Sequence, residues 1–262
     1  MSIARLPSSA NLHDERPRIH FTLQGKGGVG KSYVSSLVAQ HLVRSGIPVR
    51  CIDTDPVNDT LCKYAALKAE RLNVMVEGRV DEGAFDDMLE RILTEPISFV
   101  VDSGATSFVA LTNHLTDCKA FDLLREHGRE VIVHSVLTGG QACRDTVVGF
   151  KLIAQRCAPR SVVVWLNEFQ GPVELETEGG ARPSTTKFTQ MNAYLDHEEA
   201  VLGIVTLPRR NMDTFGRDIQ TMNARGLTFG EVRMAPGLTL ASKSRLYRVE
   251  CEIFEQLEAV LG

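Results

Sequence analysis

The chain carries at residues 24–32 the sequence Gln24-Gly25-Lys26-Gly27-Gly28-Val29-Gly30-Lys31-Ser32. A glycine, four residues and then Gly-Lys-Ser form the pattern of a loop that cradles phosphate groups. Its glycines are needed because the backbone N–H groups turn together toward one anion, which side chains would obstruct. In such a loop Lys31 supplies positive charge to the β- and γ-phosphates, and the Ser32 hydroxyl ligates Mg²⁺.

The residues on both sides of this loop strengthen the prediction. Residues 20–23 alternate polar and apolar side chains as a strand does. Apolar residues at 34–42 recur at helical spacing, and Gly46 supplies a stop. The helix adds its positive N-terminal end to the phosphate site. Strand, loop and helix together favour a phosphate site over a glycine-rich surface turn.

The rest of the chain predicts one α/β domain. It has 262 residues, 43% of them hydrophobic, which is enough to bury a substantial core. Continuous apolar segments alternate with helical patterns, as expected for a mostly parallel central sheet flanked by helices on both faces. The further expected strands are residues 48–52, 97–101, 130–137, 161–166 and 201–207, with helices near 85–93, 141–157 and 242–261.

Two segments are expected to lie outside this regular pattern. Residues 1–17 contain prolines and serines but no apolar stretch, so we expect a disordered tail before a single domain at 18–262. Residues 171–187 hold two glycines in succession, two prolines and few apolar residues. They predict a long mobile loop, either a lid near the nucleotide or a tolerated surface insertion.

Charge and composition restrict the class of function. The formal net charge is −4, and the sequence lacks the extended basic run of a dedicated nucleic-acid binder. DNA binding through a local patch stays open, and the only local basic groups are Arg209, Arg210, Lys243, Arg245 and Arg248. The six cysteines are scattered without a CxxC pair, which predicts a reducing cytoplasm and neither a disulfide nor a metal framework. No apolar stretch is long enough for a membrane span.

Three aspartates follow predicted strands. Asp53 and Asp55 end the strand at 48–52, and Asp102 ends the strand at 97–101. Ligands collect at the carboxyl ends of parallel strands, so these side chains are expected beside the phosphate loop. Asp102 is predicted to hold Mg²⁺. Of the other two, one is expected to steady the water shell of the metal while the other orients the attacking water.

The loop, residues 52–56 and residues 101–102 resemble the deviant-Walker-A ATPases, a family that includes MinD, ParA and the nitrogenase iron protein. The resemblance implies an ATP/ADP site with Mg²⁺, in which Lys26 reaches the phosphates of a partner across a nucleotide-sandwiched dimer. It links Asp55 to hydrolysis, which makes Lys26, Lys31 and Asp55 the expected catalytic residues. The expected metal residues are Ser32, Asp53 and Asp102.

The family also implies where the base of the nucleotide binds. An asparagine at the end of a later strand reads adenine, and Asn167 fits that role. Pro208, after the next strand, is expected to form the other wall. Nearly the whole chain is similar to the TraL/StbB group of plasmid proteins, which is associated with conjugal transfer and plasmid stability. The segments that carry this similarity include residues 23–26, 51–58, 136–141 and 164–167.

Three departures from the family pattern stand out. Tyr33 occupies the position of a second hydroxyl residue, so the α-phosphate is expected to depend on backbone contacts there. Gly104 follows Asp102 by two residues, earlier than in many relatives, which leaves its γ-phosphate contact open. No cysteine occurs in residues 103–115, which argues against an iron–sulfur cluster.

The sequence therefore predicts a slow, partner-stimulated ATPase that dimerises with ATP and acts in plasmid transfer or stability. Two alternatives stay open. One is a ParA-like ATPase that binds DNA. The other is a small-molecule phosphotransferase or ligase on the same scaffold.

Overall fold

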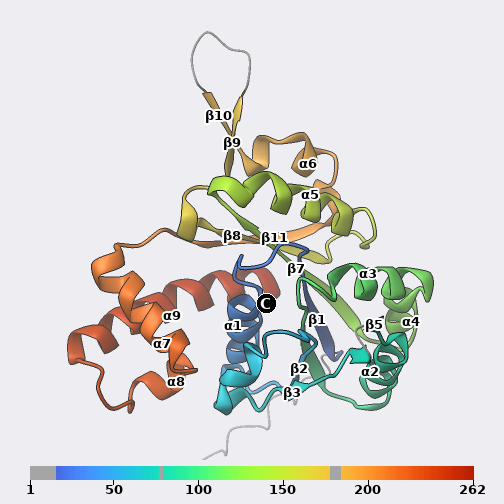
Figure 1. The fold of residues 1–262 in the computed structure, drawn as a ribbon, viewed down its shortest axis with the longest axis horizontal. Coiled ribbons are helices and arrows are strands. Elements are labelled where there is room, and N and C mark those ends of the chain that lie inside the picture. The colour runs from blue at the N-terminus through green and yellow to red at the C-terminus, as the bar shows by residue number, and fades with distance from the viewer. Residues whose placement is uncertain (1–15, 77–78, 178–183) are drawn as a thin grey trace, which may run out of the picture.

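The computed structural model describes residues 16–76, 79–177 and 184–262. Its centre is a seven-stranded sheet in the order β11-β8-β7-β1-β6-β2-β3, in which every neighbouring pair is parallel (Figure 1). The strands are β1 (Arg18–Leu23), β2 (Val49–Asp53), β3 (Glu70–Arg71), β6 (Ser98–Asp102), β7 (Glu130–Thr138), β8 (Val162–Asn167) and β11 (Val201–Leu207). The predicted parallel α/β architecture is confirmed.

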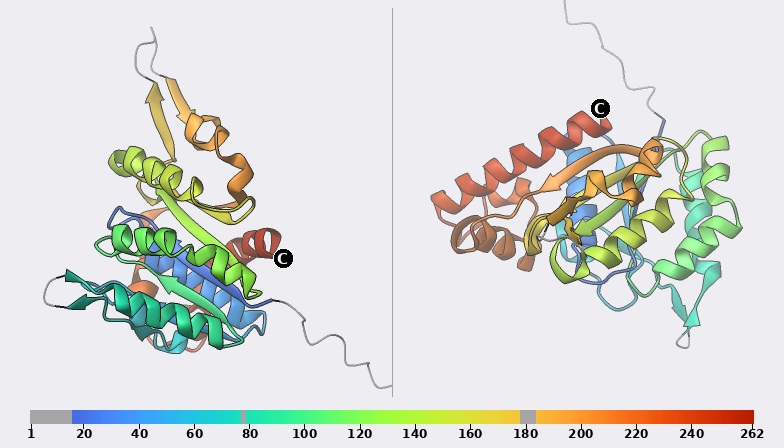
Figure 2. Two further views of the ribbon diagram at one scale, coloured as in Figure 1. Left: turned by 90° about the vertical axis from the view of Figure 1, so that its right-hand side faces the viewer. Right: turned by 90° about the horizontal axis from the view of Figure 1, so that it is seen from above.

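Helices cover both faces of this sheet (Figures 1 and 2). The first face is covered by α1 (Lys31–Arg44), α7 (Arg217–Ala224), α8 (Phe229–Val232) and α9 (Leu240–Leu261). The second face is covered by α2 (Glu82–Thr94), α3 (Phe108–Asp117), α4 (Ala120–Glu126), α5 (Cys143–Ala154) and α6 (Asn192–Leu195). The two covering layers bury the whole middle of the sheet.

Strand β1 illustrates how the sequence builds these layers. Its side chains alternate between the two faces, as in any strand. Ile19, Phe21 and Leu23 are fully buried against α2, α3 and α4. His20 and Thr22 point to the opposite face, where the Thr22 hydroxyl lies 2.8 Å from the hydroxyl of Ser35 on α1. Because both faces are covered, even the polar members of the alternation lie inside the protein.

A buried chain of polar contacts links His20 to His134 and Trp165 on the neighbouring strands. Trp165 Nε1–H donates to Nδ1 of His134 over 2.9 Å. The remaining nitrogen of His134, Nε2, lies 2.9 Å from Nδ1 of His20 on the neighbouring strand. Burial lowers the pKa of His134 to about 3, and that of His20 also falls. Both rings are therefore neutral at physiological pH.

The segment at residues 171–187 differs from its prediction. The structure contains an antiparallel hairpin there, with strands β9 (Glu174–Thr177) and β10 (Ser184–Lys187), that projects from the main body (Figures 1 and 2). Residues 174–177 and 184–187 therefore form strands where a loop was predicted, and the mobility of the segment stays a prediction. The two strands form a sheet of their own and lack the regular apolar alternation that would have signalled them. The part of the predicted mobile loop at 178–183 lies outside the described residues.

The predicted start of the domain at residue 18 lies close to the first described residues. Residues 1–15 of the predicted tail lie outside the described residues, whereas Pro17 already accepts a hydrogen bond from Glu130 N–H and extends β1. A second short hairpin joins β4 (Met75–Val76) and β5 (Arg79–Val80). Within the described ranges, no helix has the length and apolar character to cross a membrane.

Candidate functional site

The phosphate loop connects the carboxyl end of β1 to the start of α1. Gly28 has a φ of 74° and Gly30 a φ of 99°, both in the left-handed region that glycine tolerates best. A Cβ on Gly25 would lie 3.0 Å from the ring of Phe108, the first residue of α3. Conformation and close packing therefore explain why glycines stand at these positions of the loop.

Lys31 lies at the centre of the loop. Its side chain is buried, and Nζ donates to the carbonyl of Lys26 over 2.9 Å. Burial lowers the pKa of Lys31, while the nearby carboxylates of Asp102 and Asp55 raise it in part. The ammonium group is thus enclosed by the loop, close to the acids where the sequence predicted phosphate and metal binding.

Asp102 has the most unusual environment of the predicted residues. Its side chain is fully buried, and the hydroxyl of Ser35 lies 2.8 Å from Oδ1. The other oxygen, Oδ2, is buried and has no hydrogen-bond partner in the part of the chain that the structure describes. Burial raises the pKa of Asp102 to about 7, although the Ser32 and Ser35 hydroxyls act against the rise.

The geometry at Asp102 fits a magnesium ion. An orphaned, buried carboxylate oxygen is costly unless a proton or a cation satisfies it. Mg²⁺ prefers oxygen ligands and is bound through one or two carboxylates with substrate phosphates. Ser32 and Asp102 are the two predicted metal residues whose oxygens could meet such an ion, with the phosphate loop beside them.

Asp53 and Asp55 lie at the same sheet edge but are engaged with the backbone. Asp53 pairs in register with Asp102 on β6, and its two oxygens accept backbone N–H bonds from Asp55 and Leu61, each over 3.0 Å. Oδ1 of Asp55 accepts from the N–H groups of Val57 and Asn58, over 2.9 and 3.1 Å. These bonds stabilise the turn after β2 and hold both carboxylates in fixed positions.

The position of Gly104 follows from Asp55. A Cβ on Gly104 would lie 2.7 Å from Asp55 Cγ and 2.9 Å from its Cα, so no side chain fits there. The segment after Asp102 therefore packs directly against the turn that carries Asp55. This contact explains why a glycine, Gly104, stands only two residues after Asp102.

A cavity of about 260 Å³ adjoins the phosphate loop and contains the predicted base-binding residues. Its lining includes Gly30, Tyr33, Asn167, Phe169, Leu207 and Pro208. Such a mostly apolar hollow with a few polar groups is typical of a small-molecule or cofactor site. The hydroxyl of Tyr33 is buried without a hydrogen-bond partner among the described residues, and burial raises its pKa.

The side chain of Asn167 is bound to the loop itself. Its Nδ2 donates to the carbonyl of Val29 over 2.9 Å, and its Oδ1 accepts from Phe169 N–H over 3.2 Å. A Cβ on Gly30 would lie 2.8 Å from this Nδ2. In this structure Asn167 thus joins the end of β8 to the phosphate loop at the entrance of the cavity.

Lys26 differs from Lys31 in pointing away from the centre of the loop. Its Nζ lies 2.7 Å from Oδ2 of Asp145, in the first turn of α5. The two side chains are 46% and 58% exposed. Exposed ion pairs of this kind contribute at most about 1 kcal/mol. The contact can therefore open at little cost in free energy.

Three supporting residues of the site were not predicted from the sequence. Ser35 contacts Asp102, Asp145 pairs with Lys26, and Gln24 Nε2 donates to the carbonyls of Val136 and Thr146 over 3.0 and 3.1 Å. Gln24 stands directly before the loop, and Ser35 stands one helical turn after Lys31. Their closeness to the loop in sequence is the signal that could have identified both residues. Asp145 carries no comparable local signal, because only the tertiary fold brings it near Lys26.

Comparison with known proteins identifies close relatives by sequence. A protein named TraL from Escherichia coli is 41% identical over 243 residues, which cover 92% of this chain and 98% of the relative. A second Escherichia coli protein of the same name is 40% identical over 242 residues, covering 92% of this chain and 97% of the relative. No protein-family model matches the chain.

Comparison with solved structures supports the fold. The septum site-determining protein MinD from Pyrococcus horikoshii OT3, solved with Mg-ADP, aligns with a TM-score of 0.51 and 15% sequence identity. The alignment covers 94% of this chain and 99% of that chain. At this level of identity the likeness concerns the fold, which is that of a P-loop NTPase.

Proposed function

This chain belongs to the TraL family, and on that premise we propose that it is a Mg-ATP-dependent switch. In this proposal the chain binds ATP with Mg²⁺, hydrolyses it slowly and forms a homodimer in the ATP-bound state. A protein partner in plasmid transfer or plasmid maintenance distinguishes this state from the ADP-bound one. The observation that carries the proposal is Oδ2 of buried Asp102, which has no hydrogen-bond partner among the described residues and lies near the ammonium group of Lys31.

The metal and phosphate part of the proposal rests on the donor set. Ser32 and Asp102 supply the oxygens that would hold Mg²⁺, and Asp53 keeps the neighbouring strand end in place through its backbone bonds. When bound, the ion neutralises phosphate charge and orients the γ-phosphate. Lys31 and the N–H groups of residues 25–32 contribute the remaining positive potential.

Hydrolysis is assigned to Asp55. The negative charge of the Asp55 carboxylate acts on nearby Lys31 and raises the pKa of that lysine. Asp55 also packs against Gly104, in the segment that follows Asp102. A carboxylate held at this place can accept a hydrogen bond from a water molecule and orient it toward the γ-phosphate. Because orientation is its task, its loss should affect turnover more than nucleotide affinity.

The dimer part of the proposal rests on Lys26. Its ammonium group binds the exposed carboxylate of Asp145 and makes no hydrogen bond to its own phosphate loop among the described residues. In our proposal, the phosphates bound by a second copy take the place of Asp145. The weak surface pair can be exchanged readily for that more highly charged partner.

The DNA-binding alternative receives less support from the arrangement of basic residues. Arg210 lies 2.5 Å from Glu252, Arg245 lies 2.6 Å from Asp218, and Lys243 donates to the backbone carbonyl of Arg233. Three of the five basic groups named from the sequence are therefore engaged within the chain, which weakens the patch that phosphates of DNA would require.

Replacing Asp55 by asparagine is expected to lower the rate of phosphate release from ATP by about 100-fold, because the amide no longer positions the attacking water as a carboxylate does. Nucleotide affinity should change less than about threefold. Phosphate release and equilibrium binding of a fluorescent ATP analogue measure the two effects. Asp59→Asn, an exposed aspartate four residues after Asp55, is the matched control. Equal loss of binding and turnover would contradict the assigned role.

Binding of Mg-nucleotide is expected to release a proton from Asp102. The pKa of Asp102 is about 7 in the folded protein and about 3.9 in the unfolded chain. Without a cation, the folded protein therefore loses stability relative to the unfolded chain as the pH rises from about 3.9 to about 7. A cation at Oδ2 requires the ionised form. Affinity should therefore rise with pH, by up to about tenfold per unit below about pH 7, and level off above it.

Calorimetry in buffers of different ionisation enthalpy measures this proton release directly. Asp102→Asn is the control, since it keeps the shape of the side chain but cannot release the proton. Comparison of the two proteins also removes the proton uptake of the nucleotide itself. Proton release of the same size in both proteins would rule out Asp102 as its source.

A further inference from the structure

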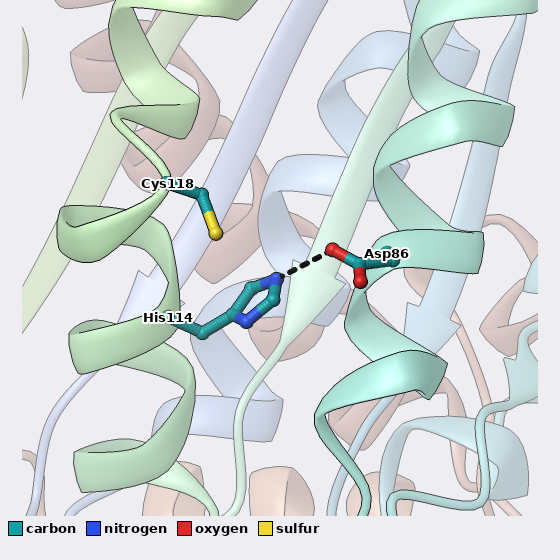
Figure 3. Close-up of side chains that lie close together, drawn as sticks. All are labelled: Asp86, His114 and Cys118. Carbon is teal, nitrogen blue, oxygen red and sulfur yellow. Dashed lines mark ion pairs between the residues drawn. The ribbon is translucent and has the colours of Figure 1, made fainter.

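A second group of ligand-type side chains lies between α2 and α3, away from the phosphate loop. Asp86 projects from α2, His114 lies in the last turn of α3, and Cys118 directly follows that helix (Figure 3). One ligand atom from each residue lies within 4.8 Å of the other two. Figure 3 shows the three side chains converging on one place between the helices. Nothing in the proposed ATPase uses them.

The local structure explains why His114 and Cys118 share one face. They are four residues apart, and the N–H of Cys118 donates to the carbonyl of His114 over 3.0 Å, which closes one helical turn. Side chains at this spacing lie above one another on a helix. Asp86 and Cys118 are exposed, so solvent ions can reach the cluster.

His114 supplies an independent observation, because its buried ring nitrogen makes no hydrogen bond among the described residues. Its side chain is only 5% exposed, and its ring packs against Phe85 with centroids 5.5 Å apart. Nε2 lies at ion-pair distance, 3.1 Å, from Oδ1 of Asp86 (Figure 3), but the contact is not a hydrogen bond. This buried nitrogen therefore has no hydrogen-bond partner among the described residues, although it points into the cluster (Figure 3).

We propose that Asp86, His114 and Cys118 bind a zinc-class divalent cation. Thiolate and imidazole ligands select borderline transition metals over Mg²⁺ or Ca²⁺. In a tetrahedral zinc site with bonds of about 2.0–2.3 Å, ligand atoms are about 3.3–3.8 Å apart. The present separations of up to 4.8 Å need a contraction of about 1 Å, within the reach of side-chain rotation at two exposed residues.

Binding would proceed by simple ligand exchange. The metal replaces the proton of the Cys118 thiol and accepts the lone pair of His114 Nε2, and one carboxylate oxygen of Asp86 completes three protein ligands. Water occupies the fourth position. The metal satisfies the buried nitrogen and joins α2 to α3. Since α3 begins at Phe108, which packs on Gly25, the cation also secures the helix that supports the phosphate loop.

Titration of the metal-free full-length chain with Co²⁺ tests the proposal, without nucleotide present. We expect one equivalent to bind and to produce the visible bands of a four-coordinate site with a thiolate-to-cobalt charge-transfer band, both removed by Zn²⁺. Excess Zn²⁺ should raise the Tm by about 5 °C or more at 100 times its Kd. Co²⁺ at the oxygen-lined nucleotide site cannot produce the thiolate band.

Two pairs of variants assign the ligands. Cys118→Ser should remove the thiolate band, while Cys251→Ser, which alters another accessible cysteine, should retain it. Asp86→Asn should weaken Co²⁺ binding at least about tenfold, while the neighbouring Asp87→Asn should not. These exposed positions avoid the folding defect that replacement of buried His114 could cause. Absence of stoichiometric binding, or a thiolate band that persists in Cys118→Ser, would overturn the proposal.

Discussion

Lys31→Ala is expected to weaken Mg-ATP binding by at least about 100-fold. The Lys31 ammonium is buried within the loop, where its interaction with a phosphate about 4 Å away amounts to about 4 kcal/mol at an effective dielectric constant of 20. Part of this energy offsets the contact with the Lys26 carbonyl that the nucleotide displaces. A net loss of about 2.7 kcal/mol corresponds to the expected 100-fold change.

Equilibrium titration with a fluorescent ATP analogue measures this loss. Lys151→Ala is the matched control, since it removes an exposed lysine from α5 and should leave the affinity unchanged. Circular dichroism establishes that both variants are folded. A Kd for Lys31→Ala within threefold of the original protein would show that the nucleotide, if bound, does not use this loop.

Lys26→Ala is expected to abolish ATP-dependent dimerisation while leaving nucleotide binding within about threefold. The side chain is directed outward and paired with Asp145, so its removal leaves the enclosed loop around Lys31 in place. In the dimer it would be the group that carries positive charge from one copy to the phosphates of the other. Loss of the Lys26 ammonium group therefore removes the attraction across the interface, while each copy still binds its own nucleotide.

Asp145→Asn distinguishes this role from a structural one. If the pair with Lys26 serves only to hold α5 near the loop, the two variants should have the same defect. If Lys26 acts across the interface, Asp145→Asn frees it, and dimerisation with ATP should be at least as strong as in the original protein. Light scattering with Mg-ATP separates these outcomes. Impaired dimerisation in Asp145→Asn would count against the proposed exchange of partners.

The parts of the site that sequence could predict are those built from local patterns. The phosphate loop is continuous in sequence, and Asp53 and Asp102 each end an apolar strand. Parallel strands bring such ends to one edge, so the juxtaposition follows from the strand assignments alone. In the structure Asp53 on β2 pairs with Asp102 on β6, as this rule predicts.

Other features depend on tertiary packing and had no local signal. Asp86 and His114 are 28 residues apart and meet only because α2 lies beside α3. The bond from Asn167 to the Val29 carbonyl likewise depends on how β8 approaches the loop. The hairpin of β9 and β10 escaped prediction because its strands are rich in Glu, Thr and Ser and lack a regular apolar alternation.

The mass of the protein in solution tests the central claim most directly. Sedimentation velocity compares the chain without nucleotide, with Mg-ADP and with Mg²⁺ and a slowly hydrolysed ATP analogue. The proposed switch predicts the mass of one chain in the first two conditions and of two chains with the ATP analogue. The same mass in all three conditions, with nucleotide binding verified in each sample that contains it, would contradict it.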